Sequence, residues 1–302
     1  MAFVSSMKAD GAEHYSDPRS VGGMLLKAGI ITATQAEEIS VYREGRGIRF
    51  GEAAVELGMI SPEALEDILA VQFSVPGRSG RRDLHEDLVM VHRPNSREAE
   101  QFRSLRNTLT MKWFRKSGVA PTLSIVSAQK GEGRSSVAAN LAICFAQVGL
   151  RTLLIDADMR DPRQHSLFGL DDRYGLSGYL SGRVEEAAYY SVNGFNTLTV
   201  IPVGGLPPNP QELLLRPSLE ELAKSAAENF EIVLFDTPAA SEGTDYQIIS
   251  AAAKGAMVVT RERRTRIGAA TRMINSLEDI GVSVGGGSML WGWTPRLRPC
   301  AG

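Results

Sequence analysis

Apolar runs in three stretches of this sequence end in residues that could bind phosphate or a metal ion. The first, Leu123–Ala146, reads LSIVSAQKGEGRSSVAANLAICFA, an apolar strand followed by a glycine-containing loop and the start of a helix. Gly131 and Gly133 allow backbone N–H groups to turn inward without a Cβ clash. The helix N-terminus adds partial positive charge. This context predicts a phosphate-binding loop.

The loop departs in two places from the general pattern G-x-x-x-x-G-K-[ST]. Ala128 stands in place of the first glycine and Arg134 in place of the lysine. Arginine keeps the charge and can fork onto phosphate, but it is bulkier than lysine. Two outcomes stay open: either Arg134 holds the phosphates, or it does not fit and the site is vestigial. We take the nucleotide-binding residues to be Lys130, Gly131, Glu132, Gly133, Arg134, Ser135 and Ser136.

Acidic residues close the other two stretches. Asp156 and Asp158 follow the apolar run of TLLIDADMRDPR, and Asp236 ends that of FEIVLFDTPAA. Ligands bind at the carboxyl ends of strands in an open α/β sheet. Buried carboxylates at this edge would need a cation, which Mg²⁺ with a triphosphate supplies. We therefore predict metal ligands and catalytic groups here. The metal ligands are Ser135, Asp156 and Asp236, and the catalytic residues are Asp156, Asp158 and Arg134.

Short β-rich runs alternate with helical stretches through most of the chain. Strands are expected at 122–127, 152–156, 198–203, 231–236 and 256–260, and helices near 97–115, 134–148, 210–228, 244–254 and 266–280. This alternation predicts an α/β fold with a doubly wound, mostly parallel sheet. The expected organisation is a disordered leader at 1–19, a small helical domain at 20–73, a linker at 74–96, the P-loop domain at 97–285 and an atypical tail at 286–302.

The expected helical domain contains an internal repeat. Val21–Ile39 and Phe50–Ile68 align at an offset of 29 residues, each with two apolar helical runs separated by a glycine and a polar residue. In the second copy, Ser61 is the expected N-cap and Pro62 the first helical residue. Two helix-turn-helix copies predict a small satellite bundle.

The motifs GEGRSSVAANLA, LLIDADMRDPR and VLFDTPAA resemble the bacterial tyrosine kinases of capsule and exopolysaccharide assembly, especially the free-standing EpsG type. These are relatives of the MinD and ParA ATPases. The resemblance covers residues 97–285 and implies an ATP- and Mg²⁺-dependent tyrosine autokinase that acts in trans within a ring. It also implies a membrane-bound partner, a chain-length determinant or polysaccharide co-polymerase. In this family an E-x-x-R-x-x-R helix forms the subunit contact, here Glu100, Arg103 and Arg106.

The N-terminal repeat resembles a second family, the MshEN-type domain of type II secretion and pilus ATPases. Some of those domains bind cyclic di-GMP through two motifs that begin Arg-Leu-Gly and end in Gln. The second copy here matches with Arg49, Gly51 and Gln72, whereas the first copy has Ser20 and Arg43 at the corresponding ends. The resemblance therefore leaves two functions open for this domain, cyclic di-GMP binding or a docking bundle.

The chain departs from the kinase pattern at its C-terminal end. It has no tyrosine after Tyr246, and the expected closing strand is missing. By accessibility Tyr15 is the better phosphoacceptor, and the adjacent Tyr189 and Tyr190 are expected to be structural. Two other functions stay open: a MinD/ParA-like ATPase switch, whose early loop lysine would fall at Gln129, and a nucleotide-sensing adaptor without catalysis.

Composition limits the remaining possibilities. The formal net charge of −2 argues against binding nucleic acid over a whole basic surface. The two cysteines have no spacing that indicates a disulfide framework or a zinc site, which fits a reducing compartment. No signal peptide is expected, because residues 1–19 are polar. The protein is expected to be cytoplasmic and to reach the inner membrane through its partner.

Overall fold

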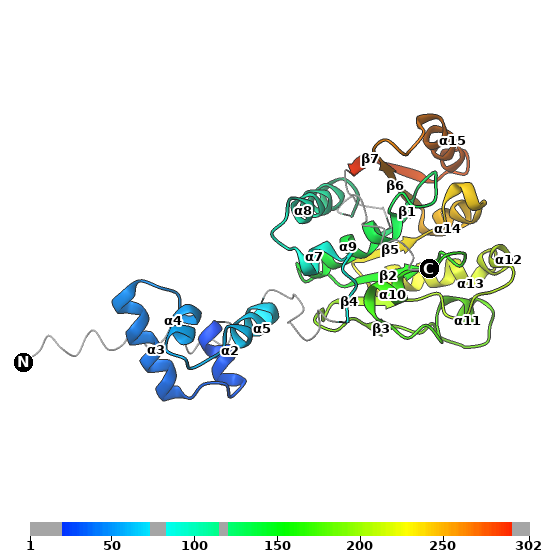
Figure 1. Cartoon of the computed structure of the whole chain (residues 1–302). Coiled ribbons are helices and arrows are strands. Elements are labelled where there is room, and N and C mark those ends of the chain that lie inside the picture. Colours follow the sequence, from blue (N-terminus) through cyan, green and yellow to red (C-terminus); the bar gives the residue numbers. More distant parts are fainter. Residues whose placement is uncertain (1–19, 73–82, 115–119, 292–302) are drawn as a thin grey trace, which may run out of the picture. The chain divides into compact units, whose positions relative to one another are not determined.

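The computed structural model describes residues 20–72, 83–114 and 120–291, with only the backbone of residues 66, 67, 70–72 and 286–291. The chain divides between residues 82 and 83 into an N-terminal helical unit and a C-terminal α/β unit (Figure 1). None of the helices in the described ranges is long and apolar enough to cross a lipid bilayer. The predicted leader at 1–19 lies outside the described residues.

The N-terminal unit repeats one helix pair at the predicted offset. Its helices are α2 (Val21–Lys27), α3 (Ala33–Arg46), α4 (Phe50–Glu56) and α5 (Pro62–Gln72). Both short helices are followed by a glycine in the left-handed region, Gly29 and Gly58, each with a φ of 66°. The Ser61 hydroxyl accepts a hydrogen bond from the Ala64 N–H, so the predicted cap of α5 is confirmed.

A seven-stranded sheet forms the centre of the C-terminal unit. Its order is β3-β4-β2-β5-β1-β6-β7, and every pairing is parallel except that of β3 with β4. The predicted α/β class is confirmed, and the five expected strands are all present. The strand bounds are β1 (Thr122–Val126), β2 (Thr152–Asp156), β3 (Tyr190–Ser191), β4 (Leu198–Ile201), β5 (Ile232–Asp236), β6 (Gly255–Arg261) and β7 (Ser283–Trp291).

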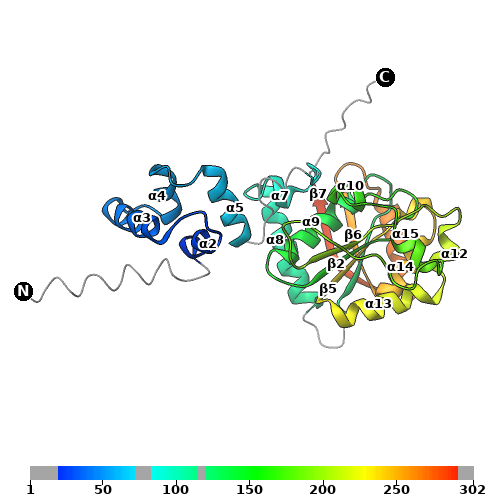
Figure 2. The same ribbon diagram turned by 90° about the horizontal axis from the view of Figure 1, so that it is seen from below.

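Helices cover both faces of this sheet (Figures 1 and 2). Strand side chains alternate between the faces, so each face has its own buried cluster. One cluster joins α7 (Val89–His92), α8 (Arg97–Leu109) and α9 (Arg134–Ala146) to the sheet. The other joins α11 (Leu176–Leu180), α12 (Pro210–Leu214), α13 (Pro217–Asn229) and α14 (Asp245–Ala253). The remaining elements are η1 (Thr110–Phe114), α10 (Gln164–Phe168), η2 (Ala240–Glu242) and α15 (Ile267–Glu278).

The predicted linker at 74–96 is wrong for residues 83–96, which belong to the α/β unit. Leu88–Val91 is fully buried in the core cluster around α9. The Asn140 side chain of α9 accepts a hydrogen bond from the Met90 N–H and donates one to the Asp87 carbonyl, each at 3.0 Å. The prolines and charged residues on either side of this segment are typical of a linker. The burial of its four apolar residues, Leu88–Val91, nevertheless places it in the core.

The predicted tail at 286–302 is also wrong in its first part, because β7 closes the sheet. β7 pairs in parallel with β6 from Gly255 opposite Ser283 to Arg261 opposite Trp291, with a register shift between Met257 and Val259. The glycines at 285–287 look unlike a strand, but backbone hydrogen bonds to β6 do not depend on side chains. Residues 292–302 lie outside the described part.

We predict that Asn140→Ala destabilises the C-terminal unit by about 1–3 kcal/mol, because it leaves a buried N–H and carbonyl group unpaired. All three tryptophans, Trp113, Trp291 and Trp293, follow residue 82 in the sequence. Urea unfolding followed by tryptophan fluorescence therefore measures this unit alone. Asn229→Ala, which removes an exposed hydrogen bond to the Ser225 carbonyl, is the control. Equal free energies of unfolding for both variants would contradict the assignment of residues 83–96.

Candidate active site

The three predicted aspartates meet at the carboxyl edge of neighbouring strands. Asp156 and Asp236 are the last residues of β2 and β5 and face each other in register. Asp158 follows two residues after β2. All three side chains are buried, with at most 1% of their surface exposed. Unpaired carboxylates this deep are unstable in the ionised form, so their charge needs a partner.

The loop between β1 and α9 borders these aspartates. Gly131 and Gly133 have φ angles of 77° and 98°, which lie in the left-handed region that a side chain disfavours. Gly133 is the N-cap of α9. Ser135 and Ser136 lie in the first turn of that helix and are partly exposed. The free N–H groups of the first helical turn can bind an anion such as phosphate.

Among the described residues, Arg134 is the only cationic side chain buried beside these aspartates. Its side chain is 6% exposed. Its Nε donates to the Thr237 carbonyl at 2.7 Å, and one terminal nitrogen donates to Ser127 Oγ at 2.6 Å and to the Gln129 carbonyl at 3.2 Å. The other terminal nitrogen lies 3.6 Å from Asp158 Oδ2. The guanidinium therefore neutralises part of the carboxylate charge from a fixed position.

Gln164 connects the two acidic strand ends. Its backbone N–H donates to Asp156 Oδ2 at 2.9 Å, and its side-chain amide donates to Asp236 Oδ2 at 2.8 Å and to the Ser135 carbonyl at 3.1 Å. Two buried oxygens next to these bonds, Gln164 Oε1 and Asp236 Oδ1, have no hydrogen-bond partner. An unpaired carboxylate oxygen here fits a site for a hydrated cation.

The residues present fit Mg²⁺ only with further ligands. In the described ranges, no three histidine, cysteine, aspartate or glutamate side chains are grouped closely enough to hold a metal ion by themselves. Mg²⁺ is usually held by one or two carboxylates together with substrate phosphates. The Asp156 and Asp236 carboxylates and the Ser135 hydroxyl at the start of α9 form such an incomplete set.

Burial raises the pKa of all three aspartates. The pKa of Asp156 lies well above its ordinary value because of burial and the neighbouring Asp236 carboxylate. Burial also raises the pKa of Asp158, although the Arg134 charge opposes the shift. For Asp236, burial and the Asp158 charge raise the pKa to about 6. Raised pKa values in a cluster of buried carboxyls are expected of a site that binds a cation with its ligand.

Charged side chains at the rim hold the loop in place. The Lys130 ammonium lies 2.8 Å from Asp161 Oδ2 and 3.6 Å from Glu242 Oε1, so it contacts phosphate only if these exposed pairs open. The buried Glu132 carboxylate accepts hydrogen bonds from the Gln129 N–H and from the Thr265 hydroxyl. The rim therefore connects the loop to β2 on one side and to the segment after β6 on the other.

Two arginines, one at the end of β6 and one in the segment that follows it, contact the loop backbone. Arg261 donates to the Gly131 carbonyl at 3.1 Å, and Arg264 donates to the Lys130 carbonyl at 3.3 Å. Sequence reasoning did not identify these arginines, Thr265 or Gln164. The only visible signal was the charge run RERRTR at 261–266, since nothing in the text around Gln164 indicates that its side chain is buried between two aspartates.

The predicted contact residues of α8 lie apart from this site and make hydrogen bonds within the chain. Arg103 donates to Glu100 at 3.0 Å and to the Pro94 carbonyl at 2.6 Å. Arg106 donates to the Cys144 carbonyl in the last turn of α9 at 3.3 Å. The Glu100 side chain is 72% exposed. An exposed carboxylate next to two partly engaged arginines leaves a charged face on α8.

The predicted cyclic di-GMP residues lie in the N-terminal unit. Arg49 is exposed at the start of α4, whereas Gly51 is buried against α5. A Cβ at Gly51 would come within 2.5 Å of a Leu65 methyl, so helix packing alone accounts for this glycine. The side chain of Gln72 lies outside the described residues. Cyclic di-GMP binding stays a prediction.

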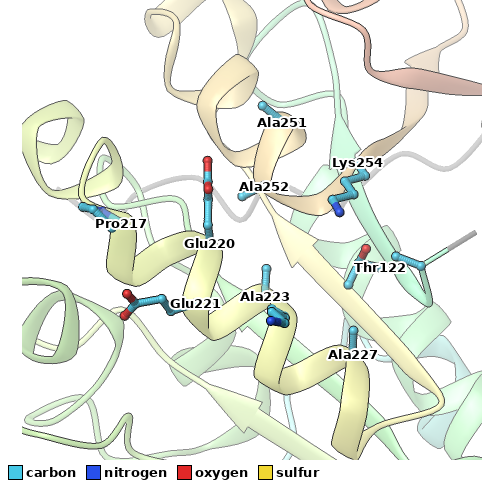
Figure 3. Close-up of a pocket in the computed structure, with 11 residues that line it drawn as sticks. Thr122, Pro217, Glu220, Glu221, Ala223, Ala227, Ala251, Ala252 and Lys254 are labelled. Carbon is cyan, nitrogen blue, oxygen red and sulfur yellow. The ribbon is translucent and has the colours of Figure 1, made fainter.

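A cavity of about 480 Å³ lies at the opposite edge of the sheet (Figure 3). It lies between α13 and the end of α14, with Glu220, Glu221, Lys224 and Lys254 at its wall. Thr122, the first residue of β1, also lines it. The aspartates stand at the carboxyl ends of the strands, so this cavity is separate from the active site.

We predict that Asp236 makes the nucleotide-free protein less stable as the pH rises. The folded-state pKa of about 6 lies above the ordinary value of 3.8, so the folded chain binds this proton more tightly. The resulting stabilisation is complete below about pH 4 and is lost as the pH passes about 6. Asp236→Asn should therefore be more stable than the wild type by about 1–3 kcal/mol at neutral pH, and by much less near pH 4.

This difference is measured by urea unfolding in metal-chelating buffer at the two pH values. Asp279→Asn, at an exposed position after α15, is the control and should show no comparable change with pH. A gain for Asp236→Asn that is the same at both pH values would contradict the assignment.

Comparison with known proteins places this geometry in a family. The family model described as "ParA: NUBPL iron-transfer P-loop NTPase" matches residues 118–287, more than half of the chain. The tyrosine-protein kinase YwqD of Bacillus subtilis (strain 168) is 34% identical over 182 residues, which cover 60% of this chain and 76% of that protein. The putative tyrosine-protein kinase AmsA of Erwinia amylovora is 31% identical over 269 residues, 83% of this chain but only 36% of AmsA.

Solved structures agree with these relatives. The kinase domain of the Escherichia coli tyrosine kinase ETK superposes with a TM-score of 0.64 at 28% identity, covering 71% of this chain and 83% of that domain. The chimerical protein CapA2B2 superposes with a TM-score of 0.61 at 27% identity, covering 72% of this chain and 95% of that one. The chain belongs to the bacterial tyrosine-protein kinases, a family of nucleotide-binding P-loop proteins related to ParA.

Proposed function

We propose that this protein transfers the γ-phosphoryl group of ATP to tyrosine side chains, including those of other copies of the same chain. The observation that carries the proposal is the set of three buried aspartates at one strand edge, next to a phosphate-binding loop and a fixed guanidinium. The relatives named as tyrosine-protein kinases support the same reaction.

The loop and the aspartates divide the binding task between them. Backbone N–H groups from Gly131 to Ser136 surround the β- and γ-phosphates, with the N-terminus of α9 adding positive charge. Ser135, Asp156 and Asp236 are the residues that would hold Mg²⁺. When bound, the ion supplies charge that offsets the phosphate oxygens as the bond to the leaving group breaks.

Asp158 accepts the proton of the attacking tyrosine hydroxyl. Its Oδ1 accepts hydrogen bonds from the Arg160 N–H at 3.2 Å and the Asp161 N–H at 3.0 Å, which fix the carboxyl group. Its other oxygen faces Arg134 at 3.6 Å. The guanidinium favours the ionised carboxylate that a base requires, whereas burial raises its proton affinity. Together these effects suit a general base.

We predict that Asp158→Asn lowers the turnover number for tyrosine phosphorylation at least a hundredfold, the effect expected when a general base is lost. Nucleotide affinity should change little, because Asp158 is not among the proposed metal ligands. Purified protein is incubated with labelled ATP, Mg²⁺ and a glutamate–tyrosine copolymer, and phosphotyrosine and released phosphate are measured separately. Asp279→Asn is again the control.

The same assay separates the competing functions. Released phosphate without phosphotyrosine would favour the ATPase switch and contradict the kinase proposal. Bound nucleotide with neither product would favour the nucleotide-sensing adaptor. A tyrosine kinase activity that survives Asp158→Asn would overturn the role of this residue and leave the kinase proposal standing.

The resemblance of the motifs to kinases of exopolysaccharide assembly suggests where this activity is used. We place it in the control of exopolysaccharide chain length, polymerisation and export. The partner is a membrane-bound chain-length determinant or polysaccharide co-polymerase, which would hold the chain at the cytoplasmic side of the inner membrane. The matched region spans 36% of the AmsA length.

The proposed ring forms through the charged face of α8. Arg103 and Arg106 each have donors that their contacts within the chain leave unused, and Glu100 is exposed next to them. Identical copies in a ring meet head to tail, so a carboxylate of one copy can contact the arginines of the next. Such charge-assisted contacts set the orientation of neighbouring copies.

We predict that Arg103→Glu with Arg106→Glu yields a monomer at concentrations where the wild type assembles. Removing one partner from a buried charge pair costs about 2–5 kcal/mol, well over a tenfold loss of affinity. Light scattering with nucleotide and Mg²⁺ measures the mass. Arg97→Glu, an exposed change on the same helix, should assemble normally. A wild type that stays monomeric at tens of micromolar would contradict the ring.

A further inference from the structure

The tyrosines of the described part differ widely in their access to solvent. Tyr246 is buried, with its hydroxyl 2.7 Å from Ser276 Oγ. Tyr42 donates to Glu56 at 3.1 Å. Tyr189 is 47% exposed, but its ring stacks on Phe230 with 6.4 Å between centroids. Tyr174 is 61% exposed, more than any other described tyrosine, and its hydroxyl has no hydrogen bond within the described structure.

Tyr174 stands on a loop that is fixed at both ends. The loop begins after Gly169, whose φ is 62°, and ends at Gly175. A Cβ at Gly175 would lie 2.2 Å from the Pro202 carbonyl, so the loop packs directly on the backbone after β4. The next N–H, of Leu176, donates to that same carbonyl at 2.8 Å. The ring therefore projects from a rigid base at the carboxyl edge of the sheet.

The loop carries two acidic residues, Asp171 and Asp172, and Arg173 stands between them and the tyrosine. Asp171 and Asp172 are both exposed, and Asp171 pairs with Arg173 at 2.8 Å. Asp172 lies 3.8 Å from the partly exposed His165. Arg173 offsets the charge of Asp171, so Asp172 is the carboxylate of this loop that is left to meet a basic surface.

The active site has such a surface in the loop between β6 and α15. Four arginines occur within six residues there, Arg261, Arg263, Arg264 and Arg266. Arg261 and Arg264 contact the phosphate-binding loop. Arg263 and Arg266 are exposed, Arg263 with 92% of its side chain, and Arg263 lies 3.7 Å from the carboxylate of the neighbouring Glu262. The basic loop therefore reaches from the phosphate-binding loop into solvent.

One chain cannot bring these two loops together. The acidic loop is anchored after β4 and the basic loop follows β6, with β2, β5 and β1 between them (Figure 1). At about 4.8 Å per strand, four spacings separate them by roughly 19 Å. The acidic loop can meet the basic loop only on a second copy.

We propose that Tyr174 is a phosphorylation site of this protein, modified by a second copy whose arginine loop at 261–266 binds the acidic residues before it. The inference rests on the proposed kinase function. The Tyr174 oxygen attacks the γ-phosphorus of ATP bound to the second copy, and the bond from phosphorus to the bridging oxygen of ADP breaks. The phenolic proton passes to Asp158 of that copy, and ADP leaves.

The test uses a full-length Asp158→Asn chain with a size tag as substrate and the untagged wild type as kinase, with ATP and Mg²⁺. Phosphopeptide mapping should find Tyr174 as the main modified site of the tagged chain. Adding Tyr174→Phe to the substrate should lower the phosphate transferred at least fivefold. Tyr189→Phe and Tyr190→Phe are matched controls and should leave most of it. None of these changes should alter phosphorylation of the glutamate–tyrosine copolymer by the wild type.

A charge exchange tests the recognition. Arg263→Glu with Arg266→Glu in the kinase should lower transfer to Tyr174 at least fivefold, and Asp171→Lys with Asp172→Lys in the substrate should restore it. Copolymer phosphorylation without phosphate on Tyr174, or transfer mainly to Tyr15, would overturn the inference and leave the kinase function intact. Modification of Tyr174 in the wild type alone, and never in the tagged substrate, would overturn transfer between copies. No phosphotyrosine anywhere would overturn both the function and the inference.

Discussion

The burial of three carboxylates beside one guanidinium constrains the rest of this structure. Asp156, Asp158 and Asp236 together could hold three negative charges, and Arg134 offsets only one. Taking charges out of water is expensive unless they are paired or protonated. The raised pKa values record this imbalance in the nucleotide-free protein. Proteins that act on ligands often keep such unfavourable groups at the active site, at the expense of stability.

Arg134 lies between the strand ends in the nucleotide-free protein, and its contact with phosphate stays a prediction. Its donors connect Ser127 after β1, Thr237 after β5 and Asp158 after β2. An ammonium group has three donors on one atom and could not make this planar set of contacts. Arginine at this position therefore connects three strand ends. This structural role does not depend on phosphate binding.

The sequence predicted those elements for which the spacing of apolar residues and the local turn and cap residues indicate the same structure. The five strands, the phosphate-binding loop and the offset of the N-terminal helices were found because apolar runs, glycines and caps mark them locally. The segment around Leu88 was missed because only contact with Asn140, fifty residues away, makes it part of the core. Gln164 and Thr265 were missed for the same reason. Their roles depend on side chains of other elements, which no local pattern records.

The arginines at the end of β6 and just after it also explain how the loop is arranged for phosphate binding. Arg264 and Arg261 hold the carbonyls of Lys130 and Gly131 on the outer side of the loop. A trans peptide is planar, so its N–H points opposite to its carbonyl. The N–H groups of Gly131 and Glu132 therefore face the inner side, where an anion would bind. Orienting these donors before the ligand arrives reduces the reorganisation needed during the reaction. The short segment at 261–266 therefore has two roles. Two of its arginines orient the phosphate-binding loop, and the other two are exposed beside that loop.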